Sequence, residues 1–444
     1  MSSLHLERPL IAGWQCAVCG ASVDIAQPFS WQCPNATEGD RHHAPQLLQS
    51  ISPLRSNGEA NPFLAFRPYL AVDAFMGAHG LTDLARTAMI GELDAAVAAV
   101  DGRGFVTTPF ERADALSAAL GFTDDGGVWV KDETNNVGGS HKARHLFTIL
   151  LHLRAAEQVG VAPWASPADR PPLAIASCGN AAIAASTLAA AVSWPIRVFV
   201  PVAADPTVKA LLHTLGAHVV ECPRLVTDPP GDPCVHRFRE AVAAGAVPFS
   251  VQGTENAWCL DGGRTIGWEM ARHMEEAIEG PPFDRLFVQV GGGAFAASVA
   301  AGFRMSGISP ALHAVQTQAC APLERAWSKA AEVGGPRLAG GHWGECMWPW
   351  EDVGQSAADG ILDDETYDWL PVLGAMADSH GSPVVVTEAQ VLEANEVGCR
   401  LTGIAASHTG TAGLAGLLAL RESAAGAAVQ SDERVAVIFS GRRR

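Results

Sequence analysis

The stretch that decides the fold runs from Lys131 to Arg144 and reads KDETNNVGGSHKAR. An apolar run with strand character ends at Lys131, and residues 141–157 carry leucine and isoleucine on one helical face. The sequence therefore predicts a strand, a glycine-containing turn, and a helix that Ser140 caps and whose first turn holds Lys142. A lysine at the positive end of a helix loses its proton more easily than a surface lysine, which suits Schiff-base formation. A solvated lysine at a helix start is the alternative that this segment alone leaves open.

The same alternation of strand and helix extends from about residue 61 to the end of the sequence. It is typical of βαβ units with a parallel sheet, so the predicted fold class is α/β. The expected strands are 128–131, 173–176, 196–200, 218–221, 286–290, 313–316 and 434–439, and a second clear helix is expected over 263–277. The expected loops are 165–172, 227–233 and 334–350, and the last of these is either a structured lid or an ordinary loop anchored by its tryptophans.

Two further segments follow predicted strands and open predicted helices. Residues 176–182 read ASCGNAA, where backbone N–H groups and Ser177 could hold a carboxylate and the Asn180 amide could reach a ring hydroxyl. Residues 290–298 read VGGGAFAAS, where the glycines allow a phosphate to approach the backbone at a helix N-terminus. The second segment lacks the Gly-Lys-Ser/Thr ending of a P-loop and the G-x-G-x-x-G spacing of dinucleotide-binding proteins. Either segment alone is compatible with a simple strand-to-helix turn.

The fourth segment is the apolar strand 435–439, which ends in Ser440 and Gly441. Ligands of open α/β sheets bind at the carboxyl ends of the strands, so a hydroxyl there faces the expected crevice. Taken together and in order, these four segments resemble the fold type II pyridoxal-phosphate enzymes of the tryptophan synthase β family, from about residue 60 to residue 444. The resemblance implies a two-domain fold with parallel-rich twisted sheets flanked by helices.

The resemblance also implies roles for individual residues. Lys142 would be the catalytic residue and would carry pyridoxal 5′-phosphate as a Schiff base. The other implied cofactor contacts are Asn180 to the 3′ oxygen, Gly291, Gly292, Gly293, Ala294 and Phe295 to the phosphate, and Ser440 to the pyridine nitrogen. The implied contacts to the substrate carboxylate are Ser177, Cys178, Gly179 and Asn180. A hydroxyl at the ring nitrogen does not protonate it as a carboxylate would, which favours expulsion of a β or γ leaving group.

Within this family the sequence is most similar to threonine synthases and their relatives. The likeness rests on Asn61-Pro62-Phe63, on residues 262–266 with Glu269, and on Ser407 to Leu414. Threonine synthase converts O-phosphohomoserine to threonine and phosphate, and Arg144, Lys209 and Arg264 are candidates to bind that phosphate, although each is also a reasonable salt-bridging residue. The alternatives are a serine or threonine dehydratase or a β-replacement enzyme such as cysteate synthase. From another class, a nucleotide-binding oxidoreductase or binding protein is kept as a hypothesis. The sequence departs from the family pattern at His141, Ala143 and Ala294 and in the arginines after Gly441.

The first 50 residues have the spacing of a small metal-binding module. Cys16 and Cys19 form a Cys-x2-Cys knuckle, and Cys33 with His42 or His43 could complete a tetrahedral zinc site. The set favoured here is Cys16, Cys19, Cys33 and His43, in a structural role. Unliganded thiols are the alternative.

The charge composition of the chain indicates which classes of binding partner are not expected. The 444 residues carry 47 acidic and 30 basic side chains, a formal net charge of −17, so nucleic acid and anionic membranes are not expected partners. Neither a secretory signal nor a membrane span is evident, and we expect a cytoplasmic protein with a small amino-acid substrate. A homodimer is expected from the resemblance alone. Lysine is scarce, with four in the chain (Lys131, Lys142, Lys209 and Lys329), which leaves few candidates for a Schiff base.

The expected domains follow from the resemblance and the alternation. Residues 1–50 form the Cys/His module, 51–147 and 251–444 form a large cofactor-binding domain, and 148–250 form a small mobile α/β domain.

Overall fold

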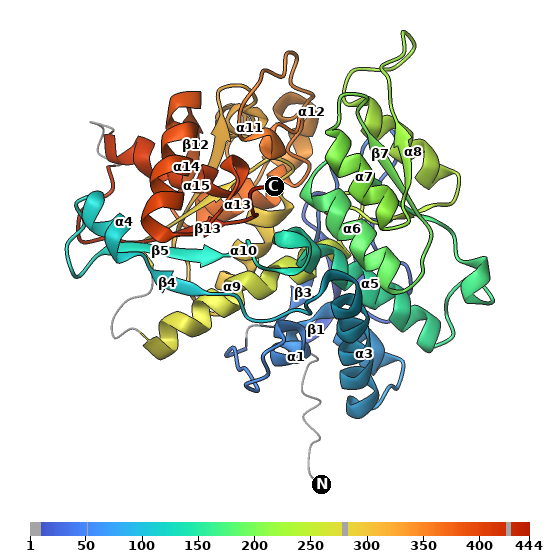
Figure 1. The fold of residues 1–444 in the computed structure, drawn as a ribbon. Coiled ribbons are helices and arrows are strands. Elements are labelled where there is room, and N and C mark those ends of the chain that lie inside the picture. Colours follow the sequence, from blue (N-terminus) through green and yellow to red (C-terminus); the bar gives the residue numbers. More distant parts are fainter. Residues whose placement is uncertain (1–9, 51, 278–282, 423–427) are drawn as a thin grey trace.

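Three β-sheets organise the chain in the computed structural model, which describes residues 10–50, 52–277, 283–422 and 428–444. The first nine residues of the predicted module and residue 51 lie outside the described residues. The six-stranded and four-stranded sheets lie on opposite sides of the view in Figure 1, with part of the N-terminal sheet between them. The structure thus has the mixed α/β class with parallel-rich sheets that the sequence predicts.

The six-stranded sheet has the order β12-β11-β10-β13-β5-β4. All its neighbouring strands are parallel except β4, which pairs antiparallel with β5 at one edge. Its strands are β4 Phe110–Arg112, β5 Gly127–Asp132, β10 Arg285–Gln289, β11 Ala311–Thr317, β12 Ser382–Val386 and β13 Arg434–Phe439. β5, β10 and β13 are almost wholly buried, as expected for parallel strands covered on both faces.

The four-stranded sheet is entirely parallel, in the order β8-β7-β6-β9. Its strands are β6 Leu173–Ala176, β7 Ile196–Val200, β8 His218–Glu221 and β9 Val247–Pro248. These strands all come from the stretch that the sequence assigns to the small domain, whereas the six-stranded sheet takes its strands from either side of that stretch. The mobility and exact bounds of that domain stay a prediction.

The N-terminal sheet is antiparallel, with β1 between β2 and β3. Its strands are β1 Ile11–Cys16, β2 Ser22–Asp24 and β3 Pro45–Gln49. Ile11, Trp14 and Ile25 belong to the same apolar core as the central helices, so this module shares its interior with the rest of the protein.

Helices cover both large sheets, and α5, α9 and α10 line the region where the site lies. The longer helices are α2 Ala71–Ala78, α3 Asp83–Asp101, α5 Lys142–Gln158, α6 Asn180–Ala191, α7 Pro206–Thr214, α8 Pro233–Ala243, α9 Trp258–Ala277, α10 Ala294–Met305, α11 Pro322–Glu332, α13 Trp369–Asp378, α14 Glu388–Thr402 and α15 His408–Glu422. The short α-helices are α1 Pro62–Ala65, α4 Asp114–Ala119 and α12 Trp343–Cys346, and five 3-10 turns are η1 Arg67–Tyr69, η2 Val137–Gly139, η3 Pro167–Asp169, η4 Ala339–His342 and η5 Asp359–Ile361.

One local prediction is wrong. Ser140 does not cap α5: its Oγ is buried without a hydrogen-bond partner, and the helix begins at Lys142 with His141 as its cap residue. The reason is that Ser140 is extended (φ −165°, ψ 166°) and pairs with Gly441 across an isolated bridge. Tertiary pairing with the end of β13 therefore overrides the local capping preference.

The segment 334–350, left open as a lid or a loop, contains η4 and α12. The Trp343 ring stacks on His42 with centroids 4.3 Å apart, and Trp348 and Trp350 lie beside the Arg325 guanidinium. This segment is thus anchored to the N-terminal module and to α11.

Candidate active site and metal centre

Lys142 is the first residue of α5 and lies directly after the extended Ser140. Burial lowers the pKa of its ammonium group below the ordinary lysine value, against the opposing attraction of Asp363 and of Cys259. A lysine with a lowered pKa supplies more of the neutral amine, the form that attacks a carbonyl.

The glycine loop 291–293 joins β10 to α10. Gly293 has φ 96°, in the left-handed region that favours glycine, and acts as the cap residue of the 12-residue helix α10. A Cβ on Gly291 would lie 2.1 Å from Asp363 Oδ2, and one on Gly293 would lie 2.9 Å from the Thr366 methyl group. The loop therefore exposes backbone donors at a helix N-terminus, and side chains at these positions would fill the space.

The predicted substrate loop leads into α6. Asn180 is the first residue of this helix, and Ser177 Oγ accepts a hydrogen bond from the Gly179 N–H at 3.4 Å. Cys178 is exposed. Its surroundings still desolvate the sulfur in part, which raises the pKa of the Cys178 thiol, and the charges of Asp359 and Asp232 raise it further.

Ser440 lies at the end of β13 and is 3% exposed. Its Oγ accepts a hydrogen bond from Gln289 Nε2 at 2.6 Å. Because the amide donates to Oγ, the Ser440 hydroxyl proton is free to be donated elsewhere. That is the hydrogen-bonding role required opposite an unprotonated ring nitrogen.

His141 connects these segments. Its backbone N–H donates to Ser440 O at 3.0 Å, and its ring stacks on Phe295 with centroids 3.9 Å apart. On the other side, a Cβ on Gly441 would lie 2.7 Å from Asn180 Nδ2 and 3.3 Å from Ser140 Cβ. The structure thus gathers Lys142, the glycine loop, Asn180 and Ser440 from elements far apart in the sequence. Their individual roles stay predictions.

A fully buried ionic cluster is built around Arg144, two residues after Lys142. Arg144 Nε and Nη2 donate to the two carboxylate oxygens of Glu133 at 2.9 and 3.0 Å, and Nη1 donates to Glu269 Oε1 at 2.6 Å. Lys131 pairs with the second Glu269 oxygen and donates to Thr108 O at 2.7 Å. Burial would raise the pKa of Glu269, but Arg144 and Lys131 bring it below its ordinary value.

The contacts of Arg144, Lys209 and Arg264 show whether these three candidates are free to bind a substrate phosphate. Arg144 belongs to the buried cluster, and Arg264 is 2% exposed and donates to Gln49 Oε1 and Tyr69 O. Lys209 pairs with Glu221 at 2.8 Å on the four-stranded sheet. In all three cases the salt-bridging or structural reading is the one that the contacts support.

The residues present fit pyridoxal phosphate. The chain offers an amine with a lowered pKa, a helix N-terminus preceded by three glycines, and a serine hydroxyl able to donate. The donors of the glycine loop also attract an anion within the chain, since the backbone N–H of Gly292 acts to lower the pKa of the nearby Asp363 carboxyl group.

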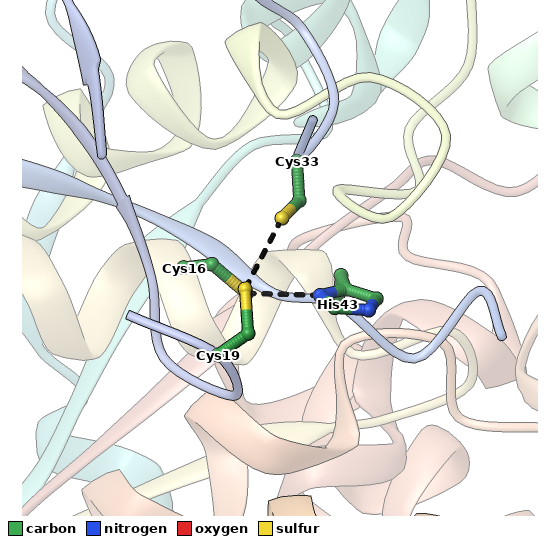
Figure 2. A group of neighbouring side chains, drawn as sticks. All are labelled: Cys16, Cys19, Cys33 and His43. Carbon is green, nitrogen blue, oxygen red and sulfur yellow. Dashed lines mark hydrogen bonds between the residues drawn. The ribbon is translucent and has the colours of Figure 1, made fainter. Parts of the chain in front are cut away.

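The N-terminal module brings its four predicted ligands together. Ligand atoms of Cys16, Cys19, Cys33 and His43 all lie within 4.8 Å of one another, and Figure 2 shows the side chains converging on one point. Cys16 Sγ lies 3.4 Å from His43 Nδ1, and Cys19 Sγ lies 3.5 Å from Cys33 Sγ. Three sulfur atoms and one imidazole nitrogen form the donor set of structural zinc sites.

His43, and not His42, joins this cluster. His43 Nε2 lies 3.3 Å from Asp40 Oδ2, which orients the ring so that Nδ1 faces the sulfur atoms. His42 instead accepts a hydrogen bond at Nδ1 from Trp369 Nε1 at 3.2 Å, and burial lowers its pKa to about 4.

Burial would raise the pKa of Cys19, but hydrogen bonds from the Ala21 backbone and the Asn35 side chain bring it to about 6.

Sequence reasoning missed two residues of the site. Gln289 is a polar residue that follows the apolar run Leu286–Val288 at the carboxyl end of β10, a signal that could have singled it out. Asp363 lies in a segment after η5 without any recognisable motif, and only the folded chain shows that it reaches the glycine loop.

A model of the family described as pyridoxal-phosphate dependent enzymes matches residues 103–441. The chain belongs to this family. It is also 25% identical over 348 residues to a threonine synthase of Methanosarcina acetivorans, covering 75% of this chain and 74% of that protein.

Solved structures of other proteins share the fold. The structure of maize serine racemase is similar with a TM-score of 0.56 and 18% identity, covering 80% of this chain and 92% of the racemase. A fungal L-serine ammonia-lyase from Rhizomucor miehei is similar with a TM-score of 0.55 and 18% identity, covering 76% and 94%. The chain is thus a fold type II enzyme of this family with a Cys/His cluster at its N-terminal end. Within the described residues, no helix is both long and apolar enough to cross a membrane.

Proposed function

We propose that this enzyme is a pyridoxal-phosphate-dependent carbon–oxygen lyase that acts on an amino acid with a β or γ leaving group. The observation that carries the proposal is Lys142 at the start of α5, largely desolvated and gathered with the glycine loop and Ser440. Family membership replaces the hypothesis of a nucleotide-binding oxidoreductase.

Each segment has a distinct task in this proposal. When bound, pyridoxal phosphate supplies an electron sink for the substrate carbon that bears the amino group. The glycine loop would bind the phosphate through backbone N–H groups, and the Ser440 hydroxyl would donate a hydrogen bond to the ring nitrogen without protonating it. The loop ending at Asn180 receives the substrate carboxylate. The neutral Nζ of Lys142 then takes the proton from that carbon as a general base.

A threonine synthase-like reaction, from O-phosphohomoserine to threonine and phosphate, is the first candidate. It is supported by the similarity to the threonine synthase of Methanosarcina acetivorans and by the segments that resemble threonine synthases.

A serine or threonine dehydratase is the second candidate, and the charges near the substrate loop favour it. The charges that act on Cys178 come from Asp359, Asp232 and Asp363. A phosphorylated substrate would meet electrostatic repulsion there, whereas a hydroxyl leaving group would not.

A cofactor test and a substrate test address the proposal. The purified enzyme should show a visible absorption band that is lost on borohydride reduction and in Lys142→Ala, but retained in Lys209→Ala, a partly exposed lysine. A wild-type protein that takes up no pyridoxal phosphate refutes the proposal. Phosphate release with threonine formation from O-phosphohomoserine selects the first candidate, and keto-acid formation from serine or threonine selects the second.

We also propose that Cys16, Cys19, Cys33 and His43 hold one structural zinc ion. The four-ligand donor set and its spacing support this, and a closed site leaves no position for a substrate. Metal analysis should find about one zinc per chain in the wild type and little in a Cys16→Ser, Cys19→Ser double variant. The proposal is refuted if the wild-type protein contains no zinc and the double variant is as stable as the wild type.

A further inference from the structure

The carboxylate of Asp363 lies against the glycine loop. A Cβ on Gly291 would lie 2.1 Å from Asp363 Oδ2, and the backbone N–H of Gly292 is close enough to lower the pKa of this carboxyl group. These donors are at the N-terminal end of α10, where the helix favours negative charge. Asp363 thus occupies a position suited to an external anion.

Lys142 is the cation whose charge acts on Asp363. Burial raises the pKa of Asp363 to about 6, and the attraction of Lys142 opposes that rise. The other charges acting on Asp363 come from Asp364 and Asp232, and both are repulsive. The Asp363 carboxylate is therefore attracted by the amine and the amide donors of the site and repelled by its acidic neighbours.

The backbone that carries Asp363 is fixed on both sides. Cys320 Sγ donates to Asp363 O at 3.2 Å, and the Trp350 N–H donates to Asp364 O at 2.8 Å. Further on, the Asp368 N–H donates to Gly292 O at 2.8 Å, and Asp368 Oδ2 accepts from the Gly253 N–H at 2.8 Å. Because this backbone is tied to the loop itself, the carboxylate stays at high local concentration beside the Gly292 donor.

We propose that Asp363 is an internal competitor for the anion site of the glycine loop and that it weakens binding of the cofactor phosphate. A phosphate dianion and a carboxylate cannot share the Gly292 donor without strong repulsion. The Asp363 side chain must therefore rotate away when the phosphate binds. This inference rests on the proposed function for the identity of the phosphate, and it makes Asp363 a determinant of how readily the enzyme loads its cofactor.

The test compares Asp363→Asn with the matched control Asp364→Asn, the neighbouring carboxylate. Dissociation constants for pyridoxal phosphate and for pyridoxal are measured by absorbance on the full-length protein after its cofactor has been removed. Asp363→Asn should bind pyridoxal phosphate about tenfold more tightly or better, because one buried like charge is removed. Asp364→Asn should change it less than about threefold, and Asp363→Glu, which keeps the charge, should stay near the wild type.

Pyridoxal separates competition for phosphate from an effect on the amine. It reacts with Lys142 in the same way but has no phosphate, so its affinity should change much less in Asp363→Asn. An equal gain for both compounds, or no gain for pyridoxal phosphate, overturns the inference.

Inorganic phosphate distinguishes this inference from the proposed function. If the wild type takes up no pyridoxal phosphate, the proposed function fails, but phosphate should still raise the melting temperature of Asp363→Asn more than that of the wild type or Asp364→Asn. Equal melting-temperature shifts in all three proteins overturn the inference as well.

Discussion

Replacing Glu269 by glutamine should cost about 3–5 kcal/mol of stability. The Glu269 carboxylate forms ion pairs with two buried cations, Arg144 and Lys131, and the substitution affects them unequally. Arg144 keeps both oxygens of Glu133, at 2.9 and 3.0 Å, so its charge remains compensated. Lys131 keeps its contact with Thr108 O but loses its carboxylate partner. The substitution therefore leaves one fully buried ammonium without its ion-pair partner, although the charge of Glu133 still attracts it.

The size of the loss can be checked in a second way. Lys131 can avoid the unpaired charge by releasing its proton, and at pH 7 this costs about 4.6 kcal/mol for a reference pKa near 10.4. That figure is the upper limit of the ammonium's share of the penalty, and it lies within the range for a broken buried pair. Replacing Lys131 by methionine in the same protein removes the charge altogether. The double variant should therefore recover at least about 2 kcal/mol relative to the sum of the two single variants.

Chemical denaturation followed by circular dichroism measures these differences. Glu275→Gln is a suitable control, since Glu275 is exposed on α9 and pairs with Arg272 at 3.3 Å, and its loss should change stability by less than about 0.5 kcal/mol. A loss below about 1 kcal/mol for Glu269→Gln, or strictly additive single and double variants, would refute the reasoning.

Three further predictions concern the buried histidine of α5, the metal centre and a helix contact. Burial lowers the pKa of His152 to about 3, so between about pH 6.5 and pH 3 the unfolded chain binds a proton that the folded chain does not. In that window the free energy of unfolding decreases by up to about 1.4 kcal/mol for each unit by which the pH is lowered. His152→Phe should reduce this pH dependence by the same amount, and an unchanged dependence contradicts the prediction. Asp40→Asn should weaken zinc binding about 10- to 100-fold in a chelator competition, because the ring of His43 loses its orienting carboxylate, whereas equal affinity would deny Asp40 that role. Gly262→Ala should lower the melting temperature by several degrees, since its Cβ would lie 1.9 Å from Arg144 O, and a melting temperature equal to that of the wild type would show that α9 can shift.

The fold was largely predictable from the sequence because its buried parallel strands are continuous apolar runs. The bounds predicted for β6, β7, β8 and β13 are those of the structure, and those for β5, β10 and β11 differ by at most two residues. β12, whose run SPVVV is short and follows a turn, was missed, as were the two- and three-residue strands β9 and β4. Such short strands depend on pairing with their neighbours more than on local pattern.

The site was predictable where it follows chain-local motifs and not where it depends on tertiary contacts. Lys142 and the glycine loop stand at strand-to-helix turns, and the folded chain gathers them as expected. The pairing of Ser140 with Gly441 and the approach of Asp363 to the loop join residues from distant segments, so no local spacing encodes them. The fourth metal ligand was ambiguous for the same reason: adjacent histidines differ only in which way the folded backbone directs them.

The shared interior of the N-terminal module has a practical consequence for shortening the chain. Trp14 is 2% exposed, and the Ala257 N–H, one residue before α9, donates to Trp31 O at 2.8 Å. Removing residues 1–50 would therefore uncover apolar surface on the catalytic part and leave the start of α9 without a backbone partner. A fragment designed from the family match alone, beginning near residue 103, would discard part of its own core and should be prone to aggregation. The region of the Cys/His cluster thus supplies part of the enzyme's apolar core, and any minimal catalytic fragment has to retain it.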